Sequence, residues 1–307
     1  MNKIEDDDIT QDSNNSEFQL KKIDLTQQRN YYKGSSKEII PGLDTGTFSL
    51  FSGKTGTGKT KAAIHVALIV CGMKQDFGFT ISSSDKHTAV VIGCEDTARQ
   101  LHEQTLTIKE NNQITDNEWL NIAERVDIYS ATDKEIDITS IQWEKELIKT
   151  LHGKTIAVID GVSNISLLDE SNESLKIIAT KIRKIASITG CAIILIHHNK
   201  KPSKESQEFD PIHTVRGGSS LVAAARSTFL FLDYDDNKQM FNNHGGKEGQ
   251  IAHIMPQINN GEKRLEPIFL DRLQAKNHEE GYSFRLAAKE QTKTSKGCSR
   301  GKRKKIK

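Results

Sequence analysis

The chain has 307 residues, enough for one large domain or two small ones, and its 35% hydrophobic and 27% charged residues are typical of a soluble globular protein. A formal net charge of +2 does not by itself indicate a nucleic-acid partner, and no apolar run is long enough to span a membrane. The acidic N-terminus lacks a signal-peptide pattern, and the four cysteines show no C-x-x-C spacing. We therefore expect a cytoplasmic protein without membrane contacts.

The two ends of the chain differ in charge and are both poor in apolar residues. Residues 1–22 are acidic and are expected to form a disordered arm. Residues 291–307 are rich in lysine and arginine and are expected to be a disordered tail, which either is simply solvated or binds phosphates without sequence preference. The intervening residues, 23–290, are predicted to form a single folded domain.

The first strong pattern is FSLFSGKTGTGKTKAAIHVALIV, which predicts a buried strand, a glycine-rich loop and a helix. The loop fits G-x-x-x-x-G-K-[ST] and consists of Gly53, Lys54, Thr55, Gly56, Thr57, Gly58, Lys59 and Thr60. Its glycines allow backbone N–H groups to surround a phosphate, Lys59 is expected to reach the β- and γ-phosphates, and Thr60 is expected to bind Mg²⁺. A glycine-rich turn with a solvated lysine is the alternative, but the flanking strand and helix favour nucleoside triphosphate binding.

A second strand is predicted at Thr88–Cys94, and it is followed at once by Glu95 and Asp96 and then by an amphipathic helix. In an α/β sheet the C-terminal ends of the strands form the ligand-binding edge, so a carboxylate here would lie near the γ-phosphate. Glu95 is our candidate for activating the attacking water. The alternative is that both acids only cap the helix; a division in which Asp96 caps and Glu95 is catalytic satisfies both interpretations.

The middle of the chain continues the alternation of helices and strands. Thr115–Glu118 is a capping-box pattern that opens a short helix, Val126–Tyr129 is predicted to be a strand, and Thr139–Leu151 is predicted to be an amphipathic helix. Thr155–Asp160 has the Walker B form, four apolar residues followed by an acid. We expect Asp160 to hold Mg²⁺ through water or together with Thr60.

Asn172–Thr189 is predicted to be a long amphipathic helix and Cys191–Ile196 a buried strand that leads into His197 and His198. Adjacent residues on a strand point to opposite faces, so one of these histidines can enter the site and contact the γ-phosphate. A metal held by the two histidines is not favoured, because no further His or Cys lies at ligand spacing.

The last part of the predicted domain begins with a polar loop at 200–215, where a DNA-contacting loop could project. RGGSSLVAAARS follows, which predicts a small-residue helix reaching Arg226. Residues 233–249 are expected to be a polar hairpin or loop. The remaining strands are expected at Ser227–Leu232, Gln250–Met255, Phe269–Ala275 and Tyr282–Leu286. Together the elements predict an α/β fold with a mainly parallel twisted sheet flanked by helices.

The ordered set GKTGTGKT, GCED, TIAVID, ILIHHNK and RGGSSLVAAARS resembles the RepA-like branch of the RecA/DnaB ATPases, the hexameric helicases of plasmids and related mobile elements. The resemblance covers roughly residues 38–280 and implies a RecA-like P-loop NTPase domain that uses ATP and Mg²⁺. It further implies that Glu95 is the catalytic glutamate, Asp160 the Walker B acid and His198 the γ-phosphate sensor. Arg226 matches an arginine finger that reaches the nucleotide of a neighbouring subunit, and Arg216 is the alternative finger.

A finger that acts on a neighbour implies a homo-oligomeric ring, which we expect to be a hexamer. The resemblance also implies that single-stranded DNA is a partner, together with a replication initiator or primase, in replicative unwinding for a plasmid, phage or integrated element. Lys276, in QAKNH, resembles a lysine on a late strand of DnaB-type helicases, but His278 stands where those helicases have an arginine. Two alternatives remain: a RecA/RadA-like recombination or repair ATPase, and an ATP-dependent regulatory switch that does not unwind DNA.

Overall fold

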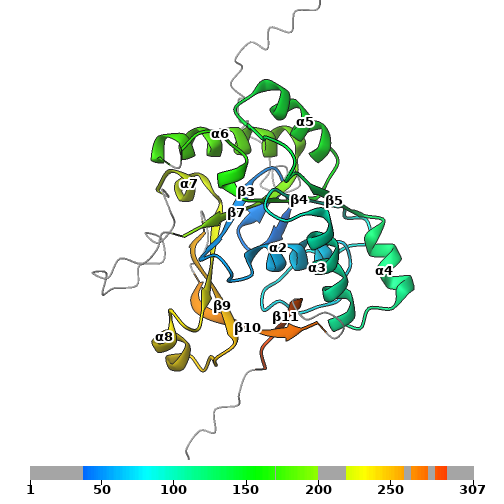
Figure 1. Cartoon of the computed structure of the whole chain (residues 1–307), viewed down its shortest axis with the longest axis vertical. Coiled ribbons are helices and arrows are strands. Elements are labelled where there is room, and N and C mark those ends of the chain that lie inside the picture. The colour runs from blue at the N-terminus through cyan, green and yellow to red at the C-terminus, as the bar shows by residue number, and fades with distance from the viewer. Residues whose placement is uncertain (1–36, 170, 200–218, 259–263, 276–280, 289–307) are drawn as a thin grey trace, which may run out of the picture. The chain divides into compact units, whose positions relative to one another are not determined.

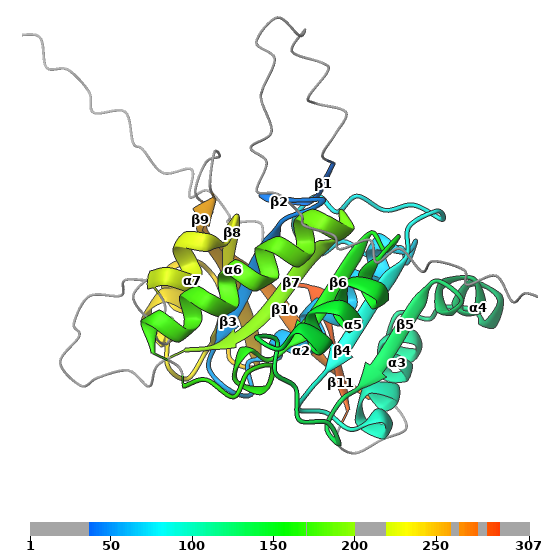
Figure 2. The same cartoon turned by 90° about the horizontal axis from the view of Figure 1, so that it is seen from above.

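A computed structural model describes residues 37–169, 171–199, 219–258, 264–275 and 281–288. These residues form a nine-stranded sheet with helices on both faces, together with a separate two-stranded hairpin (Figures 1 and 2). The predicted arm, basic tail and 200–215 loop lie outside them. Within the described residues, no helix combines the length and the apolar character needed to cross a bilayer.

The nine strands lie in the order β11-β10-β9-β8-β3-β7-β6-β4-β5. Six neighbouring strands are parallel, namely β8 (Ser227–Asp233), β3 (Phe48–Gly53), β7 (Ala192–His198), β6 (Ile156–Asp160), β4 (Ala89–Gly93) and β5 (Val126–Ser130). The three antiparallel strands are β9 (Gln250–Ile258), β10 (Arg264–Gln274) and β11 (Tyr282–Leu286). The continuous apolar sequences of β4, β6 and β7 follow from burial on both faces of the sheet.

Two hydrophobic cores lie on opposite faces of the sheet, and alternate strand residues point into each. On β7, for example, Ile194 belongs to one core and Ile193 to the other. The first core is covered by α2 (Lys59–Val70), α3 (Ala98–Asn111) and α4 (Asp116–Ala123). The second is covered by α5 (Ile141–Leu151), α6 (Asn172–Thr189) and α7 (Ser219–Ala224) (Figure 1).

Several helix boundaries follow directly from local chemistry. The predicted capping box of α4 is present, with Thr115 and Glu118 bonded reciprocally. The side chain of Ser171 caps the start of α6, and Gly190, with a φ of +70°, ends that helix. Ahead of β3, the chain forms the small hairpin of β1 (Glu38–Ile40) and β2 (Leu43–Asp44), whose apolar side chains belong to the first core.

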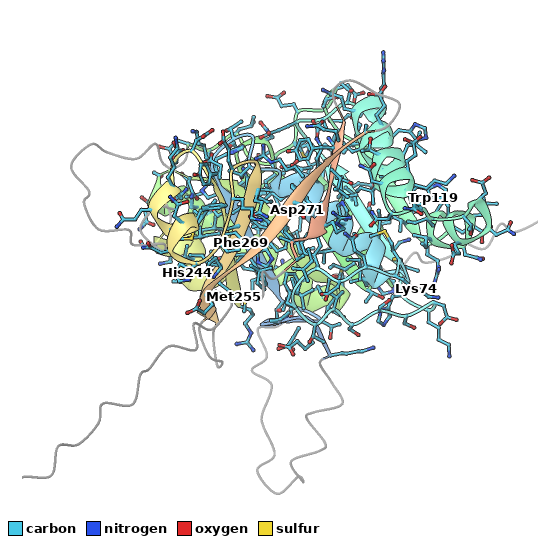
Figure 3. The ribbon with its side chains drawn as sticks, turned by 90° about the horizontal axis from the view of Figure 1, so that it is seen from below. Lys74, Trp119, His244, Met255, Phe269 and Asp271 are labelled. Carbon is cyan, nitrogen blue, oxygen red and sulfur yellow. The ribbon has the colours of Figure 1, made fainter. Side chains whose placement is uncertain are left out.

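Two expectations for the later chain were wrong. The stretch predicted to be a polar hairpin or loop contains a short helix, α8 (Lys238–Asn243), whose Phe241 is buried. Its ring lies against that of Phe269 of β10 (labelled in Figure 3), with the centroids 5.1 Å apart and the ring planes tilted by 53°. A helix with one buried anchor has too few apolar positions to show a period in sequence. The small-residue helix α7 ends before Arg226, because the backbone N–H of Arg226 already bonds to Phe48 of β3.

Candidate active site

The glycine-rich loop joins β3 to α2 at the C-terminal edge of the parallel strands. Gly58 is the N-cap of α2, with a φ of +82° that favours glycine. A Cβ atom on Gly58 would lie 2.4 Å from the ring of Phe284, and one on Gly53 would lie 2.5 Å from the carbonyl oxygen of Phe231. At Gly56, by contrast, a Cβ atom would meet nothing within 4 Å. The loop is therefore tightly supported on the side of β8 and β11 and open at Gly56, where a phosphate could enter.

Lys59 opens α2 and turns its amine into the site. Its Nζ donates to the backbone oxygen of Lys54 at 3.0 Å and lies 3.4 Å from Nδ1 of His198. Burial lowers the pKa of the amine to about 8, although Asp160 and Glu95 act to raise it. The amine thus remains mostly charged at pH 7, and it makes no direct ion pair among the described residues, so it favours an anionic ligand.

Thr60 and Asp160 come from α2 and from the end of β6, and they meet at the floor of the site. Thr60 Oγ1 donates to Asp160 Oδ2 at 2.6 Å. Asp160 is only 2% exposed, and burial raises the pKa of its carboxyl to about 6. Hydroxyl and carboxylate oxygens are ligands that Mg²⁺ prefers, so the donor set present fits the ion that the sequence predicts here.

Glu95 follows β4 and His198 ends β7, and the two side chains meet in the site. Nε2 of His198 lies 3.3 Å from Glu95 Oε1. Nδ1 of the same ring faces the donating amine of Lys59, so Nδ1 is assigned as the acceptor and Nε2 as the N–H that donates to Glu95. This bond is the main cause that lowers the pKa of Glu95, outweighing the effect of its burial. Glu95 is therefore an ionised base at neutral pH.

The two adjacent histidines point to opposite faces, as the strand pattern predicts. His197 is fully buried, whereas His198 faces the glycine-rich loop. The next residue, Asn199, fixes the ends of β7 and β3 together: its N–H donates to the carbonyl of Gly53 at 3.1 Å, and its Oδ1 accepts from Ser52 at 2.6 Å. His198 is thereby held beside the loop.

The predicted capping role of Asp96 was wrong. The N-cap of α3 is Thr97, which forms a capping box with Gln100. Asp96 instead accepts from Gln104 Nε2, at 2.9 Å. Threonine and aspartate are both good caps, and the first turn begins one residue later than the pattern suggested.

The structure does not bring Arg226 to the other predicted site residues. Its backbone N–H donates to the carbonyl of Phe48, at the first residue of β3, at 2.8 Å. The glycine-rich loop begins at Gly53, the last residue of that strand. Roughly 16 Å separates the two ends at a rise of about 3.3 Å per residue. Arg216 and Lys276 lie outside the described residues.

Sequence reasoning missed Asn164, whose Nδ2 donates to Glu95 Oε1 at 2.9 Å. Asn164 lies on the short 3₁₀ helix η1 (Val162–Asn164), which follows β6. An uncharged asparagine in a polar stretch carries no distinguishing pattern. Its only signal is its place four residues after Asp160, just beyond the ligand edge of the sheet.

Two further neighbours of the loop come from distant parts of the chain. Lys54 forms an ion pair with Asp236, with 2.7 Å between Nζ and Oδ2. The ring of Tyr282 on β11 lies between two cations: the guanidinium of Arg272 on β10 is 5.4 Å from its centre, and the amine of Lys61 on α2 is 4.0 Å from it. Arg272 also lies beside the loop itself, with 3.5 Å between its guanidinium and the carbonyl oxygen of Gly56, and 216 residues of sequence separate the two.

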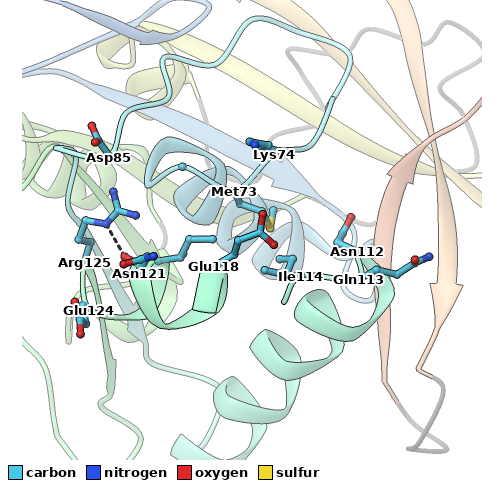
Figure 4. A pocket seen from close by; sticks show the side chains of 12 residues that line it. Met73, Lys74, Asp85, Asn112, Gln113, Ile114, Glu118, Asn121, Glu124 and Arg125 are labelled. Carbon is cyan, nitrogen blue, oxygen red and sulfur yellow. Dashed lines mark hydrogen bonds between the residues drawn. The ribbon is translucent and has the colours of Figure 1, made fainter. Parts of the chain in front are cut away.

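A cavity of about 750 Å³ lies at the other end of α2, and it shares no residue with this site (Figure 4). Its walls include Met73 after α2, Asn112 after α3, and Glu118 of α4. Arg125 also lines it, but the Nε of that side chain donates to the backbone oxygen of Asn121 at 2.7 Å. None of the five predicted residues that meet beside the glycine-rich loop (Lys59, Thr60, Glu95, Asp160 and His198) lines this cavity.

Comparison with known proteins supports the fold and gives the family. Two solved structures share the architecture, each with a TM-score of 0.54. One is described as an ATPase domain, with 13% identity over 79% of this chain and 85% of that one. The other is described as a DnaB-like replicative helicase and its interactions with primase, with 12% identity over 78% of this chain and 57% of that one. A search of the curated proteins gives no match.

At this level of identity the structural likeness establishes the fold alone, and it confirms the predicted RecA-like α/β class with its mainly parallel sheet. The sequence itself matches the family described as AAA domain over residues 15–204, a stretch that holds the glycine-rich loop and every residue gathered around Glu95. With a match over more than half of its length, the chain belongs to the AAA domain family.

Proposed function

We propose that this protein is an ATP-hydrolysing ring motor that translocates on single-stranded DNA, serving as a replicative DNA helicase of a plasmid, phage or integrated element. The observation that carries the proposal is the convergence of five side chains at one edge of the sheet. They come from four separate segments and are Lys59, Thr60, Glu95, Asp160 and His198. The fold shared with a DnaB-like replicative helicase and with a second ATPase domain of known structure supports the helicase assignment.

The residues of the loop would bind the triphosphate. Backbone N–H groups beside Gly56 and the N-terminus of α2 would surround the phosphates, and Lys59 would exchange its backbone contact for phosphate oxygens. Thr60 and Asp160 would hold Mg²⁺, which when bound neutralises part of the charge on the phosphoryl oxygens. The amine of Lys59 thus suits the negative phosphates, and the oxygens of Thr60 and Asp160 suit the positive metal ion of a metal–nucleotide substrate.

The hydrolytic step is assigned to Glu95 and His198. Ionised Glu95 would orient the attacking water and accept its proton. His198 presents an N–H at Nε2 that now contacts Glu95 and would donate to the γ-phosphate when the substrate is present. Lys59 would offset the negative charge that develops on the phosphoryl oxygens. Glu95 would thus act in the ionised state that its surroundings favour.

The place of Arg226 supports assembly into a ring. An arginine at the opposite edge of the sheet from its own loop cannot complete its own site, so a finger role requires a neighbouring subunit. We propose a closed homo-oligomer, a hexamer, in which each Arg226 faces the nucleotide of the next subunit. Hydrolysis would then move subunits relative to one another and draw loops along the DNA strand.

Steady-state ATP hydrolysis with and without single-stranded DNA tests this function, with Glu95→Gln as the matched variant. We expect DNA to stimulate hydrolysis several-fold, and Glu95→Gln to remove the activity while ATP still binds. The assay needs moderate ionic strength, because a basic tail binds DNA without specificity at low salt. A forked-duplex unwinding assay follows. Hydrolysis by a ring that DNA does not stimulate would contradict the motor and favour the regulatory switch, and filaments on DNA would favour a recombination ATPase.

A further inference from the structure

One oxygen of Glu95 is enclosed from three sides. Asn164 Nδ2 lies 2.9 Å from Oε1, and His198 Nε2 lies 3.3 Å from the same atom. Gly161 closes the third side so tightly that a Cβ atom there would lie 2.9 Å from Oε1. The second oxygen, Oε2, makes no hydrogen bond within the part of the chain that the structure describes. The carboxylate is therefore held by one oxygen, and the other is free for a ligand.

The backbone on both sides of Asn164 is anchored in the core. Val162 and Ile165 are 1% and 2% exposed and belong to the second core. The N–H of Asn164 donates to the carbonyl of Gly161 at 3.1 Å, and the carbonyl of Ile165 accepts from the N–H of Ile138 at 2.8 Å. An amide donor between two buried anchors has a fixed position, which is what orienting a carboxylate requires.

The two donors to Glu95 differ in what else they contact. The ring of His198 is shared, because its Nδ1 also lies 3.4 Å from both Lys59 Nζ and Thr55 Oγ1. The side chain of Asn164 bonds to Glu95 alone among the described residues. In the proposed function His198 turns to the γ-phosphate, so the hydrogen bond from Asn164 is the one that remains when water attacks.

We propose that Asn164 is a positioning residue that holds Oε1 of Glu95 and thereby directs Oε2 towards the attacking water. Asn164 does not touch the reacting atoms. It acts through Glu95, and the inference rests on the proposed function of that residue. Nothing in the family motifs of the sequence assigns this asparagine a role.

The test compares two variants of Asn164 with a matched control. Asn164→Leu keeps the approximate volume and removes the donor, and Asn164→Asp keeps the shape and replaces the donor with a repelling oxygen. Asn121→Leu makes the same chemical change at an exposed position on α4, remote from Glu95. For each protein we would measure kcat and KM of ATP hydrolysis, affinity for a fluorescent ATP analogue, and the melting temperature.

We expect both Asn164 variants to lower kcat roughly 10- to 100-fold, the usual cost of a misplaced catalytic group, with KM, nucleotide affinity and melting temperature unchanged. Asn121→Leu should leave kcat unchanged. In single-turnover measurements, adding Asn164→Leu to Glu95→Gln should cause little further loss, because both changes remove the action of the same carboxylate.

Two results would overturn the inference: an unchanged kcat in Asn164→Leu while Glu95→Gln is inactive, or fully additive losses in the double variant. A parallel rise in KM and fall in melting temperature in both Asn164 variants would also count against it, because that pattern shows a structural role. An active Glu95→Gln protein would instead refute the proposed catalytic role of Glu95, which separates the two failures.

Discussion

Two glycines of the loop share a left-handed backbone but differ in what surrounds them. Gly56 and Gly58 have φ values of +84° and +82°. A Cβ atom would meet open space at Gly56, whereas at Gly58 it would collide with the ring of Phe284. The pair therefore separates the cost of the backbone conformation from the cost of steric overlap.

Replacing each glycine with alanine should expose that difference in stability. Gly56→Ala should lower the free energy of unfolding by about 1–2 kcal/mol, the cost of a left-handed residue with a side chain. Gly58→Ala should lower it by about 2–5 kcal/mol, because overpacking against Phe284 adds about 1–3 kcal/mol. Urea denaturation of both variants measures the difference. Equal losses would show that Phe284 moves aside freely.

Some residues at the candidate site can be predicted from the sequence, and others cannot. Lys59, Thr60 and Asp160 are predicted because they occupy fixed places after apolar runs, and strand ends meet at one edge of a parallel sheet. Glu95 follows from the same argument, whereas for the histidines it predicts only that one of the adjacent pair enters the site, and the family resemblance selects His198. The structure brings all five together. Asn164 and the flanking residues of the late strands leave no such pattern, since their proximity depends on how distant segments pack.

At the scale of elements, the backbone of Phe284 ties β11 both to α2 and to the segment that follows α2. Phe284 of β11 donates its backbone N–H to His65 Nε2 at 3.2 Å, and its carbonyl accepts from Gln75 Nε2 at 2.6 Å. Nδ1 of His65 in turn lies 2.8 Å from Gln75 Oε1. The imidazole is thus neutral, with Nδ1 as donor and Nε2 as acceptor, and burial lowers its pKa to about 4.

This junction should make the stability of the fold depend on pH. The pKa of His65 lies below its ordinary value of 6.5, so between about pH 6.5 and 4 the unfolded chain binds the proton and the folded chain does not. The stabilisation is therefore complete above pH 6.5 and is lost as the pH falls. At pH 5 the loss should be about 2 kcal/mol relative to pH 7.5.

Urea denaturation at the two pH values, for the wild type and for His65→Gln, would measure this contribution. Glutamine does not titrate, so the variant should lose less stability on acidification, and the difference isolates His65 from the other histidines. The same loss in both proteins would show that His65 does not govern the acid response.

The elements themselves follow largely from the sequence, with informative exceptions. The long helices and parallel strands have clear periods, and even the capping box of α4 is readable. The short helix α8 cannot be predicted in this way. It is stabilised by the burial of Phe241 against Phe269, a contact that leaves no periodic pattern in the sequence. The order of the strands also requires the structure: β7 lies between β3 and β6, although it follows both in sequence.

At the scale of the whole molecule, the separation of Arg226 from its own loop makes a prediction about assembly. Arg226→Ala should lose ATP hydrolysis but keep ATP binding, and Lys59→Ala should lose phosphate binding but keep its arginine. If Arg226 acts on a neighbour, a mixture of the two inactive proteins forms some interfaces in which an intact loop faces an intact arginine.

We therefore expect hydrolysis to return when the two variants are mixed and allowed to exchange subunits. The measurement is the ATPase rate as a function of mixing ratio, with each variant alone as the control. Undiminished activity in Arg226→Ala would refute the finger, and failure of every mixture to recover activity would refute its action between subunits.

The contact between Phe284 and Gly58 also bears on how the protein is made. The loop and α2 leave the ribosome early, but the strand that packs against them is the last one described, 226 residues later. A nascent chain that ends before Tyr282 leaves part of the first core, and the supported side of the loop, exposed to solvent. The half of the sheet that carries the loop therefore reaches its final packing only when nearly the whole domain has been synthesised, and folding depends on contacts of long sequence separation.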